Sequence, residues 1–98
     1  MPKIIVETKV VGFLSNVQLW LEGQETNLSY DGNKTWKSTD QVTVNDGILS
    51  IMLHCQGFTG AKWEITINDT KSAKELYKEK GSIDETGHSL LVDGVKIS

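Results

Sequence analysis

Residues 42–55 read VTVNDGILSIMLHC, two runs of alternating apolar and polar residues on either side of an Asp-Gly pair. Alternation with a period of two is the pattern of a half-buried strand. Asp-Gly between two such runs is typical of a tight hairpin, because Gly adopts positive φ freely and Asp tolerates it. The stretch therefore predicts a hairpin at Asp46-Gly47 that places Val44 opposite Leu49.

Two further Asp-Gly pairs occupy residues 31–32 and 93–94. We expect a hairpin at each, the first closed by a three-residue loop over 31–33. A polar four-residue loop over 22–25 is expected to join two more strands and to place Leu19 opposite Leu28. About seven to nine short strands with frequent turns predict an all-β fold, an antiparallel β-sandwich of the immunoglobulin-like, transthyretin-like or C2-like kind.

One segment departs from the strand pattern. Ser72 and Glu75 have the spacing of a capping box, and Ala73, Leu76 and Tyr77 form an apolar stripe at helical spacing. The pattern predicts one short helix near residues 72–80, packed on a sheet.

The predicted core contains the apolar residues that keep one phase within each strand. Directly opposed residues of an antiparallel pair point to the same face, so the expected hairpins bring these residues together. The core residues are expected to be Ile4, Val6, Val10, Val17, Leu19, Leu21, Leu28, Trp36, Val42, Val44, Leu49, Ile51, Leu53, Trp63, Ile65, Ile67, Leu90 and Val92.

Length and composition narrow the class of protein. A chain of 98 residues is expected to form a single β-sandwich domain, residues 1–98. The net charge of −3 and the absence of arginine argue against nucleic-acid binding. No signal-like or membrane-spanning apolar stretch is present, so we expect no membrane insertion. The compartment stays open between the cytoplasm and an extracytoplasmic location from which a signal was removed.

Residues with catalytic potential do not form a recognisable set. His54 and Cys55 are neighbours on a predicted strand and should point to opposite faces, with Cys55 in the core. His88, the second histidine, is far from His54 in sequence. We therefore expect no catalytic residues, no metal site and no cofactor.

Trp20 is the one tryptophan out of phase with the predicted core. In the expected register it opposes Asn27, which in turn opposes Lys37, and Gln18 shares its face. Trp20 could lie beneath the predicted helix or a loop, contact Lys37 as a cation–π pair, join a protein interface, or stack on a sugar ring.

These observations predict a non-enzymatic binding or interaction module. Its partner is expected to be another protein or a second copy of the chain, bound through a sheet face or edge. The alternative is a small carbohydrate-binding module with Trp20 as stacking platform. The candidate ligand-binding or interface residues are Trp20, Gln18, Asn27 and Lys37.

Overall fold

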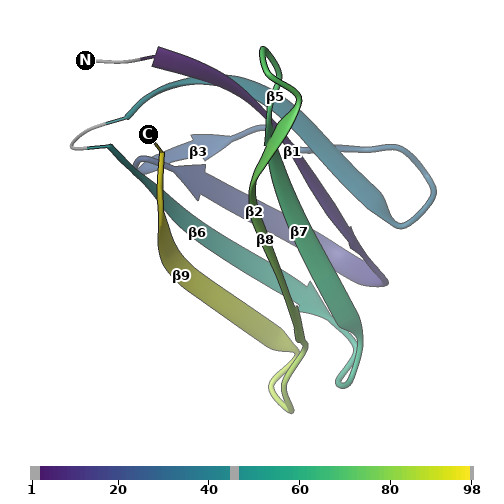
Figure 1. Cartoon of the computed structure of the whole chain (residues 1–98). Coiled ribbons are helices and arrows are strands. Elements are labelled where there is room, and N and C mark those ends of the chain that lie inside the picture. Colours follow the sequence, from purple (N-terminus) through teal and green to yellow (C-terminus); the bar gives the residue numbers. More distant parts are fainter. Residues whose placement is uncertain (1–2, 45–46, 98) are drawn as a thin grey trace.

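The computed structural model describes residues 3–44 and 47–97. Every regular element in these residues is a β-strand (Figure 1). None of them forms a helix long and apolar enough to span a membrane. The strands are β1 (Lys3–Gly12), β2 (Leu14–Leu21), β3 (Gln24–Thr26), β4 (Ser29–Tyr30), β5 (Thr35–Thr43), β6 (Ile48–Gly57), β7 (Lys62–Asp69), β8 (Lys74–Ser82) and β9 (His88–Lys96).

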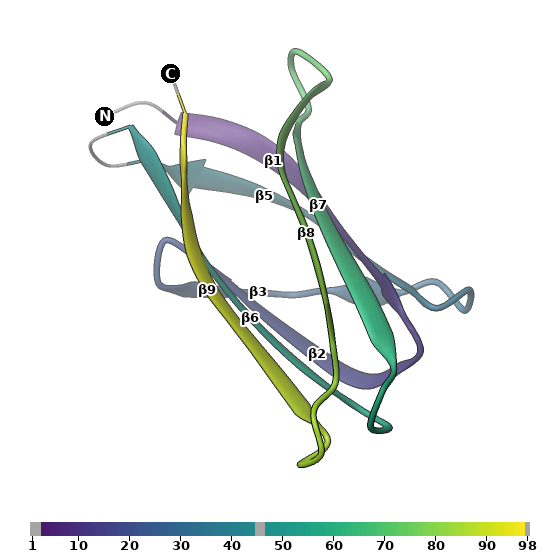
Figure 2. The ribbon, with the colours of Figure 1, turned by 60° about the horizontal axis from the view of Figure 1, so that its bottom comes forward.

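The strands form two antiparallel sheets that pack face to face. The five-stranded sheet has the order β4-β5-β1-β7-β8, and the four-stranded sheet has the order β3-β2-β6-β9. Edge strands β8 and β9 lie side by side, one from each sheet (Figure 2). The predicted all-β antiparallel sandwich is therefore confirmed.

The core lies between the sheets and follows the alternation in the sequence. Strand β6 shows the pattern most clearly, with Leu49, Ile51, Leu53 and Cys55 buried. This strand is central, because it pairs with β2 on one side and β9 on the other. The buried apolar residues are Val6, Val10, Val17, Leu19, Leu21, Val42, Val44, Leu49, Ile51, Leu53, Cys55, Trp63, Ile65, Ile67 and Ile83.

The core prediction is wrong at two residues of β9. Leu90 and Val92 are 65% and 69% exposed. The Asp93-Gly94 pair is not a turn, because β9 runs through it and pairs with β6 from His88 to Lys96. Ser89 and Leu91 point inward instead. Three expected core residues (Ile4, Leu28 and Trp36) are only partly buried, and Ile83 is a buried residue that the periodicity missed.

The other expected hairpins also differ from the structure. Strands β5 and β6 belong to different sheets, so Val44 and Leu49 are both buried but are not paired. Asn45 and Asp46 of that connection lie outside the described residues. The turn after β2 has two residues, Glu22 and Gly23, both with positive φ as a type I′ turn requires.

The connection between β4 and β5 is longer than expected, and it shifts the register. Tyr30 pairs with Trp36 rather than with Lys34, and Leu28 lies outside the strands. The loop closes through a hydrogen bond from the Asp31 amide to the Thr35 carbonyl. The expected pairing of Leu19 with Leu28 is also absent, because the two-residue turn after β2 pairs Leu19 with Thr26.

The predicted helix over 72–80 is wrong, since this segment is a turn followed by β8. Ser72 Oγ accepts a hydrogen bond from the Lys74 amide, and Ala73 has φ 56°. A Ser hydroxyl that bonds a nearby amide favours a turn as readily as a helix start. Pairing with β7 then extends the chain as an edge strand. Its lysines are a common protection of an exposed sheet edge.

Tyr77 and Asp93 join the edge strands of the two sheets. The Tyr77 hydroxyl donates a 2.8 Å hydrogen bond to Asp93 Oδ2. Burial, followed by this bond and the charge of Asp93, raises the pKa of Tyr77. The same hydrogen bond, with one from the Gly94 amide, lowers the pKa of Asp93. Each shift favours the state in which a neutral phenol donates to a carboxylate.

We expect this pair to make stability depend on pH at both ends of the range. The lowered pKa of Asp93 contributes stability above the unfolded value near about pH 4, and this contribution is lost as the pH falls below it. The raised pKa of Tyr77 contributes stability below about pH 10, and this is lost as the pH rises. Melting temperatures measured from pH 2 to 11 should fall less steeply at both ends in Tyr77→Phe. If the melting temperatures of wild type and Tyr77→Phe changed with pH in parallel, the coupling between Tyr77 and Asp93 would be contradicted.

Candidate functional site

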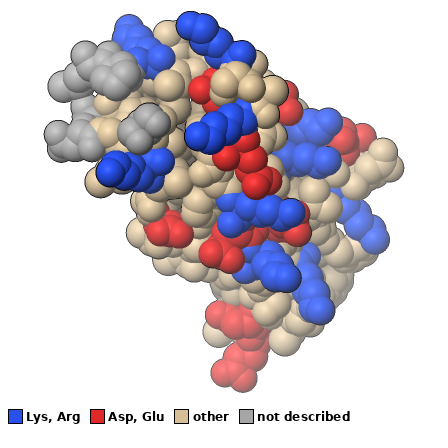
Figure 3. Space-filling model, viewed as in Figure 1, with Lys and Arg blue, Asp and Glu red and all other residues tan. Residues whose placement is uncertain are grey.

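The outer face of the five-stranded sheet carries charges of both signs. Glu7 and Lys9 of β1 alternate with buried residues and therefore point outward, as does Lys37 of β5. Lys78 and Glu64 form an ion pair at 3.6 Å. Lysine and acidic side chains are interleaved over the centre of the view in Figure 3. A face with interleaved charges of this kind is well solvated.

The outer face of the four-stranded sheet has a different composition. In its middle, strand pairing arranges the side chains of β2, β6 and β9 in three rows, and none of the residues in these rows is an Asp, Glu or Lys. Glu25 of β3 and Lys96 of β9 are charged residues of the same face that lie outside the three rows. We call this surface the uncharged face. Its rows are Trp20–Met52–Val92, Gln18–His54–Leu90 and Asn16–Gln56–His88.

The first row makes the uncharged face apolar at one end. Trp20 and Met52 are half-buried and directly opposed, and Val92 opposes Met52 from the other side. Together with Gly23, Ser50, Ile51 and Asp93 they line a shallow hollow of about 280 Å³. Leu90, on the second row, extends the apolar surface along β9.

Hydrogen bonds between side chains connect the other two rows. His54 Nδ1 lies 3.1 Å from Gln18 Oε1, and His54 Nε2 lies 3.0 Å from His88 Nδ1. Gln56 Nε2 is 3.4 Å from the same nitrogen of His88. Asn16 Nδ2 donates to Gln56 Oε1 at 3.3 Å. The uncharged face thus combines an apolar end with an amide and imidazole end.

Two of the four candidate site residues predicted from the sequence lie on this face. Trp20 and Gln18 are on β2 and point outward, as expected. The shorter turn after β2 places Glu25, not Asn27, opposite Trp20. Asn27 lies in the connection from β3 to β4, between the two sheets.

Lys37 is not a neighbour of Trp20. It belongs to β5 and projects from the outer face of the other sheet, so the two side chains lie on opposite sides of the sandwich. A cation–π contact between them, one of the alternatives for Trp20, is therefore ruled out. The predicted helix above Trp20 is absent as well, because residues 74–82 form strand β8 of the five-stranded sheet.

Three residues of the uncharged face on β9 were not expected there. His88, Leu90 and Val92 alternate in one phase along β9, and that phase points outward. The spacing of two residues from His88 to Leu90 to Val92 was the sequence pattern that placed them on one face. The Asp-Gly pair that follows suggested a hairpin and so assigned Leu90 and Val92 to the core.

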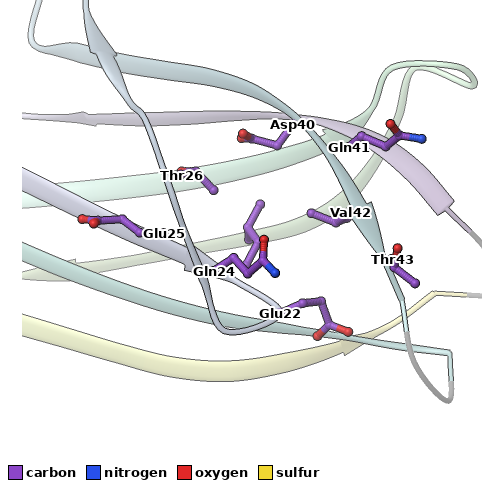
Figure 4. A pocket seen from close by; sticks show the side chains of 9 residues that line it. Glu22, Gln24, Glu25, Thr26, Asp40, Gln41, Val42 and Thr43 are labelled. Atoms are coloured by element: carbon purple, nitrogen blue, oxygen red, sulfur yellow. The ribbon is translucent and has the colours of Figure 1, made fainter.

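A second cavity opens at the side of the sandwich, between the β2–β3 hairpin and β5 (Figure 4). Its volume is about 280 Å³, and Glu22, Glu25 and Asp40 are among its lining residues. Glu22 accepts a hydrogen bond from the Ser50 amide, and Asp40 accepts one from the Ser38 hydroxyl. Histidine, cysteine and lysine are absent from its lining. These two carboxylates therefore have structural partners.

A buried thiol and an exposed aromatic pair lie away from both of these surfaces. The Cys55 thiol is fully buried, and burial raises its pKa to about 12, which makes it a poor nucleophile and metal ligand. Cys55 points into the core and His54 points outward, as predicted for neighbours on a strand. Phe13 and Phe58 are exposed and stack at one end of the sandwich, with the Lys34 ammonium over the Phe13 ring.

Comparison of the chain with protein-family models, with curated proteins and with solved structures gives no match. Among the described residues, no three His, Cys, Asp or Glu side chains gather into a group that could hold a metal ion. The uncharged face is therefore the candidate functional site.

Proposed function

We propose that this chain is a non-enzymatic interaction module that binds another protein chain, a second copy of itself included, through the uncharged face. The observation that carries the proposal is the apolar row Trp20–Met52–Val92 with Leu90 beside it. Exposed apolar surface gathered in one place, with polar groups beside it, is typical of an interaction site.

The chemistry of these side chains suits a protein partner. Trp and Met are enriched at the centres of protein interfaces, whereas Lys, Glu and Asp are depleted there. The three rows carry no side-chain charge, and the neighbouring carboxylates of Glu25 and Asp93 lie beside the apolar row, where a partner can leave them solvated at the rim. The large desolvation penalty of a buried charge is then avoided. The neighbouring amides and imidazoles supply hydrogen-bond partners for the rim.

The sheet face fits this role better than a sheet edge. The free edges of β8 and β9 lie beside each other and are joined by the Tyr77–Asp93 hydrogen bond. Edge strand β8 also carries Lys74, Lys78 and Lys80, which disfavour the addition of another strand.

A charge placed in the apolar row of the uncharged face tests the proposal. Val92→Lys changes an exposed side chain, so stability should change by less than about 0.5 kcal/mol. Sedimentation velocity over a concentration series should show self-association in the wild type, weakened at least about tenfold by the uncompensated charge. Ile5→Lys, on the outer face of the five-stranded sheet, is the matched control and should behave as wild type.

A partner other than a second copy calls for an in-cell measurement. A photo-cross-linking amino acid at position 92 should give defined adducts, with a second copy or another protein, and the same group at position 5 should not. The proposal fails if the wild type stays monomeric at millimolar concentration and position 92 gives no more adducts than position 5.

Carbohydrate binding is the second proposal for the same surface, with Trp20 as the stacking platform. Of the polar neighbours expected for it, Asn27 and Lys37 lie elsewhere, and Gln18 Oε1 is hydrogen-bonded to His54. A protein partner therefore has the stronger support. Trp fluorescence across a glycan panel, with Trp20→Ala as control, distinguishes the two proposals.

A further inference from the structure

The two histidines of the sequence meet on the uncharged face, although 34 positions separate them along the chain. His54 lies in the middle of β6, and His88 begins β9. Because Gln56 pairs with His88 and Leu90 pairs with His54, the two imidazoles are diagonal neighbours across one strand pair. Their rings are nearly parallel, at an angle of 7°.

Gln18 determines which nitrogen of His54 carries its proton. An amide oxygen only accepts hydrogen bonds, so His54 Nδ1, at 3.1 Å from Gln18 Oε1, must be the donor. In the neutral ring the lone pair is then on Nε2, the nitrogen next to His88 Nδ1. This arrangement is the one found around metal-binding histidines, whose second nitrogen donates to a carbonyl or carboxylate that orients the ring.

Two hydrogen bonds compete for one atom, His88 Nδ1, and only one of them can form at a time. To bond the lone pair of His54, His88 Nδ1 must donate a proton. Gln56 Nε2 is also a donor and lies 3.4 Å from the same atom. His88 Nδ1 cannot donate to His54 and accept from Gln56 at once. A cation that took both imidazole lone pairs would replace the proton between the rings, and Gln56 Nε2 would then not bond His88 Nδ1.

The distance between the two nitrogens fits such a cation. Imidazole nitrogens bind such dications at about 2.0–2.1 Å, so two of them are about 2.9 Å apart at the 90° angle of an octahedral or square-planar ion and about 3.3–3.4 Å apart on tetrahedral zinc. The observed separation is 3.0 Å. Imidazole is a preferred ligand of Zn²⁺, Ni²⁺ and Cu²⁺. We propose that His54 Nε2 and His88 Nδ1 together chelate one such transition-metal dication, with Gln18 as a positioning residue and the other coordination positions open to solvent.

Calorimetric titration of the full chain with NiCl₂ or ZnCl₂ at pH 7.5, in a non-chelating buffer, tests this site. The wild type should bind one ion, and His88→Gln should weaken binding at least about tenfold because one ligand is lost. Gln18→Leu keeps both imidazoles and should weaken binding to a smaller extent. Binding should also weaken as the pH falls, since protons compete with the metal for the same nitrogens.

A rescue variant separates chelation by the pair from binding to His54 alone. Leu90 is exposed and directly opposite His54, so Leu90→His in the His88→Gln background places a second imidazole on the same face. This double variant should recover most of the affinity. In NMR spectra of the wild type, Ni²⁺ should broaden the imidazole signals of both histidines.

Equal affinity of wild type and His88→Gln would overturn the proposal, and so would imidazole signals that Ni²⁺ leaves sharp. The outcome is independent of the proposed protein binding, which Val92→Lys tests without altering either histidine.

Discussion

Leu53→Ala should lower the free energy of unfolding by about 2–5 kcal/mol, a large part of the stability of a domain of this size. Leu53 is fully buried at the middle of β6. Its replacement removes buried apolar surface and leaves a cavity that strands on both sides of β6 prevent from collapsing. Urea denaturation followed by Trp fluorescence measures the change.

Leu90→Ala is the matched control, because the same side chain is removed one strand away. Leu90 is 65% exposed on the outer face of β9. We expect a change within about 0.5 kcal/mol. The sequence pattern assigned both leucines to the core, so the pair of variants tests the phase of β9 directly. A loss of 2 kcal/mol or more in Leu90→Ala would show that β9 is turned the other way.

The sequence predicted which residues of most strands point inward, because burial of one face imposes a period of two that needs no knowledge of the partner strand. Strand β7 illustrates this. Trp63, Ile65 and Ile67 were assigned to the core from spacing alone, and all three are buried. The same local rule separated His54 from Cys55.

Strand partners could not be predicted in this way. Asp-Gly reports only that two residues tolerate an unusual backbone conformation, and other arrangements use the same residues. Asp93-Gly94 stays in a strand because β6 supplies a continuous hydrogen-bonded neighbour. Between β5 and β6 the chain passes from one sheet to the other. In both places the conformation depends on pairing with strands that are distant in sequence, which a local sequence pattern does not reveal.

The same difference between side-chain orientation, which is predictable, and strand partners, which are not, applies to the candidate site. Trp20 was recognised because its phase conflicts with its apolar character, which is a local observation. Its neighbours depend on strand order, so Asn27 and Lys37 were assigned wrongly and Val92 was missed. The contact between His54 and His88 needs the pairing of β6 with β9, which was not predicted.

Gly81→Ala should lower the free energy of unfolding by about 1–3 kcal/mol, although alanine is favoured over glycine within a strand by about 0.5–1 kcal/mol. A methyl group at this position of β8 would lie 2.5 Å from Cζ2 of Trp63 and 2.8 Å from its Cε2. These distances are far below van der Waals contact, so the steric term exceeds the gain in backbone entropy.

The Trp63 ring has little freedom to move aside. It is 5% exposed, and its Nε1 donates a 3.0 Å hydrogen bond to Ser89 Oγ on β9. Displacement of the ring would break a polar contact between the two sheets and disturb the packing of β7. The new methyl group must therefore be accommodated by movement of β8, whose pairing with β7 would suffer.

A double-mutant cycle with Trp63→Phe identifies the cause of the destabilisation. Phenylalanine lacks the outer indole atoms, so Gly81→Ala in this background should be neutral or stabilising by up to about 1 kcal/mol. The coupling energy between the two positions should then be about 1–3 kcal/mol. Urea denaturation of the four proteins supplies the cycle. A loss that is equal in both backgrounds would mean that β8 needs glycine for its backbone conformation. A loss confined to the Trp63 background means that Gly81 provides the space in which Trp63 connects the two sheets.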